Sequence, residues 1–339
     1  MGPVKIRVEG VSKVFGRDPK GALAKVRAGM DKTRLKDETD HVLGLHDISL
    51  DIRAGETFVI MGLSGSGKST LIRHFNRLIE PTGGHILFDG EDILSFDAAR
   101  LQVFRRRKVA MVFQRFALLP HKTVIENVAY GLTLDGVPKA EALRRAGEQI
   151  ALVGLSGFET SYPAQLSGGM QQRVGLARAL ATDAEVLLMD EAFSALDPLI
   201  RHDMQLQLKD LQARLGKTIV FITHDLDEAL LLGDHIAILK DGTLRQVGTG
   251  ADILARPADD YVARFVRDVN RGRILLCGAF ADAGLIPAAD APVIGAEATL
   301  EAAFAAFAGG AQAVAVRNGD GRIAGALTAQ RVMEVLARE

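Results

Sequence analysis

The chain has 339 residues, of which 41 are basic, 42 are acidic and 48% are apolar. This length and apolar content suit one large α/β domain with a smaller appendage, and they exclude disorder as the default state. The formal net charge of −1 excludes a general attraction to nucleic acid or anionic lipid. The single cysteine, Cys277, excludes an intrachain disulfide, and no charged-then-apolar leader precedes the first predicted strand, so we expect an intracellular protein.

Two antiparallel strands are predicted near the start of the chain, at Ile6–Phe15 and Val42–Ile52. The charged segment between them, Arg17–Asp40, has helical character. We interpret this segment as a solvated surface insert.

A phosphate-binding loop is predicted where the apolar strand Thr57–Met61 runs into a helical pattern. Its glycines allow successive backbone N–H groups to surround an anion, and the positive end of the helix adds to the attraction. Lys68 can reach the β- and γ-phosphates, and the Ser69 hydroxyl can hold Mg²⁺. The predicted nucleotide-binding residues here are Gly62, Leu63, Ser64, Gly65, Ser66, Gly67, Lys68, Ser69 and Thr70.

Further short apolar runs predict a mostly parallel sheet covered by helices. They lie at Val109–Phe113, Val186–Met189, Ile219–Thr223 and Ile236–Leu239. Between Gln114 and Val186 the strand pattern gives way to helical sequence, so we expect a helical subdomain, at about 115–182, inserted into the α/β domain.

An acidic pair, Asp190 and Glu191, ends the apolar run Val186–Met189. Open parallel sheets place their ligands at the carboxyl ends of the strands. We expect Asp190 to hold Mg²⁺ and Glu191 to act as the general base that polarises the attacking water.

A second anion-binding helix start is predicted at Ser167, which lies 23 residues before Asp190. Ser167 is a natural N-cap, and Gly168 and Gly169 leave backbone N–H groups uncovered. Alone, Ser-Gly-Gly is a weak signal, and its meaning depends on the other motifs.

After Leu239 a hairpin at Lys240–Arg245 and an amphipathic stretch at Ala251–Val269 are predicted to complete the first domain. We place the boundary near residues 271–273, which gives domains at 1–272 and 274–339. The tail predicts a helix at Thr299–Ala308, a strand at Ala313–Val316 and a final helix at Thr328–Ala337. The second domain is therefore expected to be a small α+β module.

The order of these motifs resembles the ATPase subunit of an ATP-binding cassette (ABC) transporter. The matching residues are Gly62–Thr70, Gln114, Leu166–Met170, Asp190, Glu191, the segment Ser194 to Asp197, and His224. The segment Leu166–Met170 corresponds to the signature motif of the family, and Met170 stands where the commonest form of that motif has Gln. The resemblance implies a P-loop ABC nucleotide-binding domain with a mostly parallel sheet, an antiparallel β subdomain and a helical subdomain.

The same resemblance implies roles for the remaining site residues. Phe15 would stack on adenine, and Asp197 would lie in the loop after the acidic pair, next to bound nucleotide. Gln114 would touch Mg²⁺ or the attacking water, and His224 would bond the γ-phosphate or that water. The cofactors implied are ATP and Mg²⁺. Two copies would form a homodimer, with each ATP between the phosphate loop of one and Ser167, Gly168 and Gly169 of the other.

Within the family, the sequence around these motifs is similar to that of the glycine betaine and proline importers, over roughly residues 4–272. The resemblance implies ATP-driven uptake of a quaternary ammonium compatible solute that other subunits recognise. The partners implied are an integral membrane permease and, through it, a substrate-binding protein, with no nucleic acid. The chain would lie on the cytoplasmic face of the inner membrane, and residues 115–121 would face the permease.

Three other functions remain open at this point. They are an importer ATPase for a different small solute, a soluble ABC ATPase acting on DNA or ribosomes, and a nucleotide-sensing module without turnover. The lack of coiled-coil arms or tandem cassettes disfavours the second, and Glu191 disfavours the third.

The tail resembles a single cystathionine-synthase-type (CBS) repeat. Pro292–Ile294, Ala298–Glu301 and Asp320–Thr328 stand at the corresponding places. The resemblance implies that two protomers pair their single repeats. Arg331 stands where nucleotide-binding repeats have Asp, so we expect an osmotic or ionic-strength role rather than adenosine sensing. Loss of the salt response on deletion of residues 274–339 would support that role.

Overall fold

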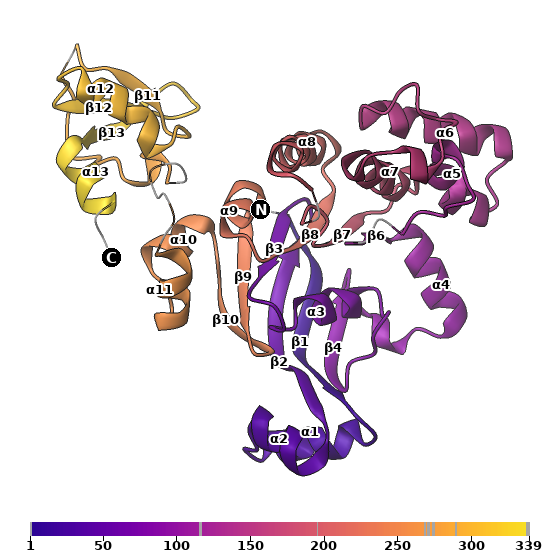
Figure 1. Cartoon of the computed structure of the whole chain (residues 1–339). Helices are drawn as coiled ribbons and strands as arrows, with labels where there is room; N and C mark the ends of the chain where they lie inside the picture. Colours follow the sequence, from indigo (N-terminus) through magenta and orange to yellow (C-terminus); the bar gives the residue numbers. More distant parts are fainter. Residues whose placement is uncertain are drawn as a thin grey trace. The chain divides into compact units, whose positions relative to one another are not determined.

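The computed structural model describes residues 2–114, 117–194, 196–267, 269, 272, 275–288 and 290–336. The chain forms two compact units, Met1–Thr249 and Gly250–Glu339. Figure 1 shows the elements of both units, and each unit is described by itself.

The first unit holds most of the helices and strands. In chain order they are β1 Val4–Phe15, α1 Pro19–Arg27, α2 Lys32–Thr39, β2 Val42–Arg53, β3 Thr57–Met61, α3 Lys68–Phe75, β4 Gly83–Phe88, β5 Glu91–Asp92, α4 Ala98–Arg107, β6 Val109–Val112, α5 Val124–Leu134, α6 Lys139–Leu152, α7 Gly168–Ala181, β7 Val186–Asp190, α8 Pro198–Leu215, β8 Thr218–Thr223, α9 Leu226–Leu232, β9 His235–Lys240 and β10 Thr243–Gly248.

A six-stranded sheet with the order β10-β9-β3-β8-β7-β6 forms the centre of this unit. Strands β6, β7, β8, β3 and β9 run parallel, and β10 pairs antiparallel with β9. Every residue of β3, β7 and β8 is buried, as is typical of strands covered on both faces. The predicted parallel sheet and its strands are therefore confirmed.

A second, four-stranded sheet has the order β2-β1-β4-β5. Strands β1 and β2 pair antiparallel with Phe15 opposite Val42, as predicted. Strand β4 was not predicted from the sequence, although residues 85–88 alternate in burial directly after Pro-Thr-Gly-Gly at 81–84. Side chains from this sheet, such as Ile48 and Ile86, share one hydrophobic core with Phe58 and Leu71, so the two sheets hold each other in place.

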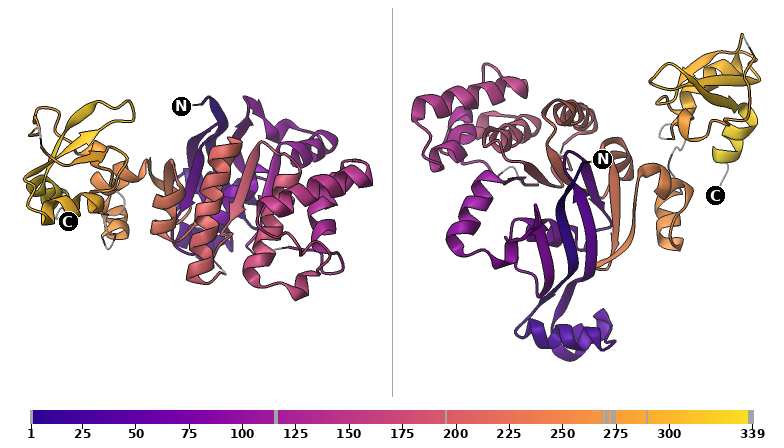
Figure 2. Two further views of the ribbon diagram at one scale, coloured as in Figure 1. Left: turned by 90° about the horizontal axis from the view of Figure 1, so that it is seen from above. Right: turned by 180° about the vertical axis from the view of Figure 1, so that it is seen from behind.

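The segment between β1 and β2 folds into helices α1 and α2, which we call the α1–α2 insert (residues 17–40). Asp18 and Asp31 cap the two helices by accepting bonds from backbone N–H groups. The insert has its own small core of Val14, Ala22, Leu23, Val26, Leu35 and Leu43. Figure 2 shows it at the far end of the β1–β2 pair, away from α5 and α6.

Helices α5, α6 and α7 form the helical subdomain that the sequence predicts, between β6 and β7. They contact one another, and Figure 1 shows them grouped beside the edge of the large sheet. A capping box of Thr123 and Glu126 starts α5.

The second unit contains the predicted α+β tail. Its elements are α10 Gly250–Ala255, α11 Asp260–Val266, β11 Val293–Gly295, α12 Phe304–Ala308, β12 Ala313–Arg317, β13 Ile323–Thr328 and α13 Ala329–Leu336. The sheet order is β11-β12-β13, with β11 parallel and β13 antiparallel to β12. Compactness assigns α10 and α11 to this unit, whereas we predicted that they complete the first. Three of the four residues from 271 to 274 lie outside the described set, and the boundary at residues 271–273 stays a prediction.

Within the described residues, no helix combines the length and apolar character that crossing a bilayer requires.

His74 on α3 is fully buried, and burial, aided by the nearby charge of Lys13, lowers its pKa from 6.5 to about 4. In the unfolded chain His74 would bind a proton near pH 6.5, but in the folded protein only near pH 4. His74 therefore does not reduce the free energy of unfolding above pH 6.5. As the pH drops from 6.5 toward 4, that free energy falls by about 3 kcal/mol in total, because the unfolded chain binds a proton that the folded chain does not.

We expect His74→Met to reduce the loss of unfolding free energy between pH 7 and pH 4.5, measured by urea denaturation, because Met does not titrate. The exposed His85, whose pKa the hydrogen bond to Asp92 raises, provides the control His85→Met, which should not reduce the acid-induced loss. An acid-induced loss that is the same in His74→Met and the wild type would contradict the role of His74.

Candidate functional site

The predicted phosphate loop lies between β3 and α3 and depends on glycines with positive φ. Gly62, Gly65 and Gly67 have φ values of 150°, 78° and 102°. A Cβ at Gly62 would lie 2.3 Å from the carbonyl oxygen of Leu239, and one at Gly67 would lie 2.8 Å from that of Gly44. The loop is therefore a tight backbone cradle that larger residues cannot form.

Helix α3 begins directly at Lys68, and its N-cap Gly67 makes no side-chain hydrogen bond to cap it. The first N–H groups of the helix thus lack a capping side chain and can bind an anion. The loop is also fixed from outside, because Gly242 donates its N–H to the Ser66 carbonyl at 2.9 Å.

The Lys68 ammonium is buried in this cradle. It donates to the carbonyl oxygens of Gly62 at 2.7 Å and Leu63 at 3.1 Å, and it lies 3.8 Å from a Glu191 oxygen. Burial lowers the pKa of Lys68, and the charges of Glu191 and Asp190 oppose that shift. A cation held in this way is placed to bind phosphate oxygens.

The acidic pair lies at the carboxyl end of β7, as predicted. The Ser69 hydroxyl donates to Asp190 at 2.8 Å, and Arg73 donates to the other Asp190 oxygen at 3.2 Å. Hydroxyl and carboxylate oxygens side by side are the hard ligands that Mg²⁺ prefers, so Ser69 and Asp190 fit the predicted metal. Arg73 was missed, although it lies four residues after Ser69 and therefore on the same helix face.

Glu191 has a left-handed backbone conformation with φ of 46°, which is uncommon outside glycine. Gln114 donates its side-chain N–H to Glu191 at 3.1 Å, and the Nδ1 atom of His224 lies 3.7 Å from the same Glu191 oxygen. The three predicted catalytic residues therefore meet at one point. Ser194, which donates its hydroxyl to the Glu191 carbonyl at 2.9 Å, also supports the turn.

Phe15 lies at the end of β1 and is 39% exposed. A Cβ on Gly44 would lie only 2.7 Å from the Phe15 ring, and the carbonyl of the same Gly44 abuts Gly67. The Gly44 backbone therefore lies between the Phe15 ring and the phosphate loop. The Lys13 ammonium lies 5.0 Å from the ring centroid.

Ser167 caps α7, as predicted, by accepting a bond from the Met170 N–H at 3.3 Å. Asp197 caps α8 in the same way, by accepting from Ile200 at 3.1 Å. A Cβ at Gly169 would lie 2.7 Å from Ile200. The structure therefore places the signature residues against the first turn of α8, which Asp197 caps. Ala195, Arg115 and Phe116 lie outside the described residues.

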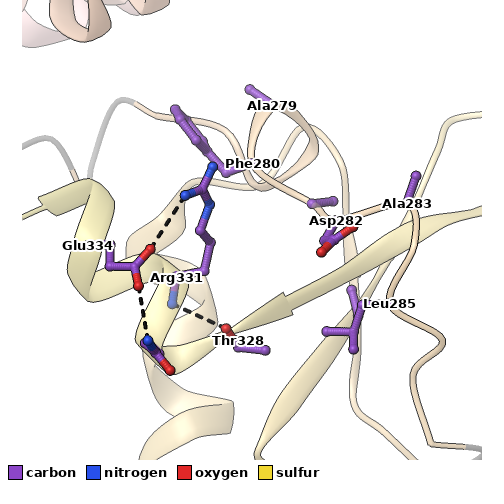
Figure 3. Close-up of a pocket in the computed structure, with 11 residues that line it drawn as sticks. Ala279, Phe280, Asp282, Ala283, Leu285, Thr328, Arg331 and Glu334 are labelled. Atoms are coloured by element: carbon purple, nitrogen blue, oxygen red, sulfur yellow. Dashed lines mark hydrogen bonds and ion pairs between the residues drawn. The ribbon is translucent and has the colours of Figure 1, made fainter.

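The second unit contains a separate pocket of about 490 Å³ beside the start of α13. Figure 3 shows Arg331 in this pocket, where its backbone N–H donates to the Thr328 hydroxyl at 3.1 Å and its guanidinium lies 3.4 Å from Glu334. Asp282 and Phe280 are among the other residues that line it. Arg331, which stands where nucleotide-binding repeats have Asp, thus lies in a pocket together with the acidic residues Asp282 and Glu334.

Comparison with known proteins identifies the class of protein that this fold and site define. Residues 45–194 match the ABC transporter family. The chain is 33% identical to the ATP-binding cassette MJ0796, solved as a dimer bound to ADP and Pi; the match covers 72% of this chain and 98% of that one, with a TM-score of 0.61. It is 25% identical to cbiO1 from Clostridium perfringens, with a TM-score of 0.63 over 79% of this chain and 96% of that chain.

Curated relatives are closer in sequence. The glycine betaine transport ATP-binding protein OpuAA of Bacillus subtilis is 55% identical over 81% of this chain and 66% of its own length. The glycine betaine/proline betaine transport system ATP-binding protein ProV of Escherichia coli is 52% identical over 80% of this chain and 68% of its own length. The trimethylamine N-oxide transport system ATP-binding protein TmoW of Ruegeria pomeroyi is 44% identical over 100% of this chain and 98% of its own length. The chain belongs to the ABC transporter family of ATP-binding proteins.

Gly67→Ala should weaken ATP binding about tenfold or more, because both the positive φ and the contact with Gly44 oppose a side chain at this position. Gly65→Ala is the matched control, since Gly65 also has positive φ but nothing lies within 4 Å of a Cβ there. Calorimetric titration with ATP, together with melting temperatures, measures the difference. Equal binding losses in the two variants would show that close packing against Gly44 is unimportant.

Proposed function

We propose that the chain is the ATP-hydrolysing subunit of an ABC importer for a quaternary ammonium or related methylated amine solute. The observation that carries the proposal is the convergence of Lys68, Ser69, Asp190 and Glu191 at the carboxyl end of the sheet. The sequence identity with importer subunits named for such solutes supports the choice of solute class.

In the proposed reaction, Gly62–Thr70 surround the β- and γ-phosphates of ATP, and Lys68 neutralises part of their charge. Glu191 accepts a hydrogen bond from water and orients it for attack on the γ-phosphorus. Gln114 and His224, which flank Glu191, hold the carboxylate and sense the γ-phosphate. Phe15 stacks on the base.

Ser69 and Asp190 would hold Mg²⁺, with Gln114 near it, and the bound ion would neutralise developing charge on the phosphate oxygens. Arg73, which binds Asp190, would keep the carboxylate in place.

The complete site is proposed to require two copies of the chain. The N–H groups around Ser167, Gly168 and Gly169 from a partner copy would cover the γ-phosphate of the ATP bound at Lys68. The dimer named for the related MJ0796 cassette supports this arrangement.

The helical subdomain would pass dimer closure to a membrane permease, which places the chain at the cytoplasmic face of the inner membrane. A solute-binding protein would act only through the permease. The tail, proposed as a single CBS-like repeat, would pair with its copy in the dimer.

Two kinds of solute, betaines and trimethylamine N-oxide, deserve a direct comparison. Glycine betaine or proline betaine is favoured by the higher identities, 55% and 52%, of relatives named for them. Trimethylamine N-oxide is favoured by TmoW, which alone of these three matches the full chain, tail included.

Glu191→Gln should lower ATP hydrolysis at least about a hundredfold, because the amide cannot act as a base, and it should leave ATP binding intact. Phosphate release and gel filtration with ATP measure turnover and the ATP-bound dimer. Retained turnover would refute Glu191 as the base, and an exclusively monomeric protein with full activity would refute the shared site.

Uptake of labelled glycine betaine and labelled trimethylamine N-oxide, by cells that express the chain with its genomic permease and binding protein, should show saturable transport of at least one. The Glu191→Gln variant is the control and should abolish it. Transport of neither solute, in cells where the complex is present and hydrolyses ATP, would refute the proposed solute class.

A further inference from the structure

His41 joins the two ends of the α1–α2 insert. Its Nε2 atom lies 3.0 Å from the backbone N–H nitrogen of Asp18, and its Nδ1 atom lies 2.6 Å from the carbonyl oxygen of Thr39. Asp18 opens α1 and Thr39 ends α2. A single imidazole ring therefore links the residues at which the insert leaves and re-enters the strand pair.

These two bonds require one particular form of the ring. A backbone N–H can only donate, so Nε2 must accept, and a carbonyl can only accept, so Nδ1 must carry the proton. Both bonds form together only in the neutral Nδ1–H tautomer, which we assign from this geometry.

The His41 ring also packs on the backbone that follows Phe15. Gly16 has φ of 145°, and a Cβ there would lie 2.2 Å from the His41 Cδ2 atom. Gly16 is therefore required for the ring to approach, and the chain leaves Phe15 along a path that His41 defines.

Besides the Lys13 ammonium, which lies 5.0 Å from the ring centroid, Phe15 has little other support on its exposed side. Its cross-strand neighbour Val42 is 46% exposed, whereas the adjacent residues Val14 and Leu43 are part of the small core of the insert. Three residues beyond His41, Gly44 contacts both the Phe15 ring and the phosphate loop. The position of the ring relative to that loop thus depends on how residues 16 and 41 are held together.

We propose that His41 is a positioning residue that holds the Phe15 ring at the correct distance from the phosphate loop to receive the nucleotide base. This inference rests on the proposed function, in which Phe15 stacks on the base of ATP. It assigns the α1–α2 insert a role in recognising the base of the nucleotide and none in binding its phosphates.

The test compares a ligand that has a base with one that has none. We would measure the dissociation constants of ATP and of inorganic tripolyphosphate, in EDTA to prevent turnover, for the wild type, Phe15→Ala, His41→Ala and the double variant. Stacking of a base on an aromatic ring contributes about 1–3 kcal/mol, so Phe15→Ala should weaken ATP binding about 5- to 150-fold.

His41→Ala should weaken ATP binding about threefold or more, which is part of the Phe15 effect, and should leave tripolyphosphate binding unchanged. In the Phe15→Ala background it should add nothing further, because it acts through the ring. His41→Gln, whose side-chain oxygen can accept the Asp18 N–H, should restore part of the affinity.

Arg34→Ala is the matched control, since within the described residues the Arg34 side chain pairs only with Glu38 on the exposed face of α2, and melting temperatures verify folding. Equal losses for ATP and tripolyphosphate, or a full His41 effect without the Phe15 ring, would overturn the proposal. If Phe15→Ala weakens neither ligand, the base lies elsewhere and the premise fails as well. Unchanged ATP binding in His41→Ala with a normal Phe15→Ala loss would refute the His41 role alone.

Discussion

The burial of positive charge at the start of α3 is the constraint on which the rest of the site depends. The Lys68 ammonium has little access to water, and the first N–H groups of α3 have no side-chain cap. Both features are stable only where negative charge is near. The carboxylates of Asp190, at the end of β7, and of Glu191, directly after it, supply some of it, and a bound triphosphate would supply more. The parallel sheet serves this arrangement because β3 and β7, separated only by β8, end at the same edge.

Much of this could be predicted from sequence because the chemistry is local. Two motifs directly follow a buried strand, namely Gly62–Thr70 after β3 and Asp190–Glu191 at the end of β7. The predicted strand therefore fixes the position of each motif at the carboxyl edge of the sheet. Arg73 was within reach of the same reasoning, since helix periodicity places it beside Ser69.

Other features depended on contacts between distant segments and could not be predicted. Gly44 is an unremarkable residue in a strand until the fold sets it between Phe15 and Gly67. Strand β4 could not be recognised because its alternation is short and its partner residues in β1 lie 71 to 82 positions away in the chain. The placement of Gln114 and His224 beside Glu191 was implied by family resemblance, and no spacing rule for a single sequence gives it.

The order of strands in the large sheet has a mechanical consequence. The chain leaves the sheet after β6, at one edge, and returns in β7, the neighbouring strand. The helical subdomain is therefore attached through a single margin of the sheet, close to Gln114 and Glu191. A rotation of α5, α6 and α7 as a rigid group would disturb that margin and the contacts with α8, such as the bond from Gln207 to the Leu152 carbonyl at 3.3 Å. The hydrogen bonds among β8, β3, β9 and β10 could remain intact throughout.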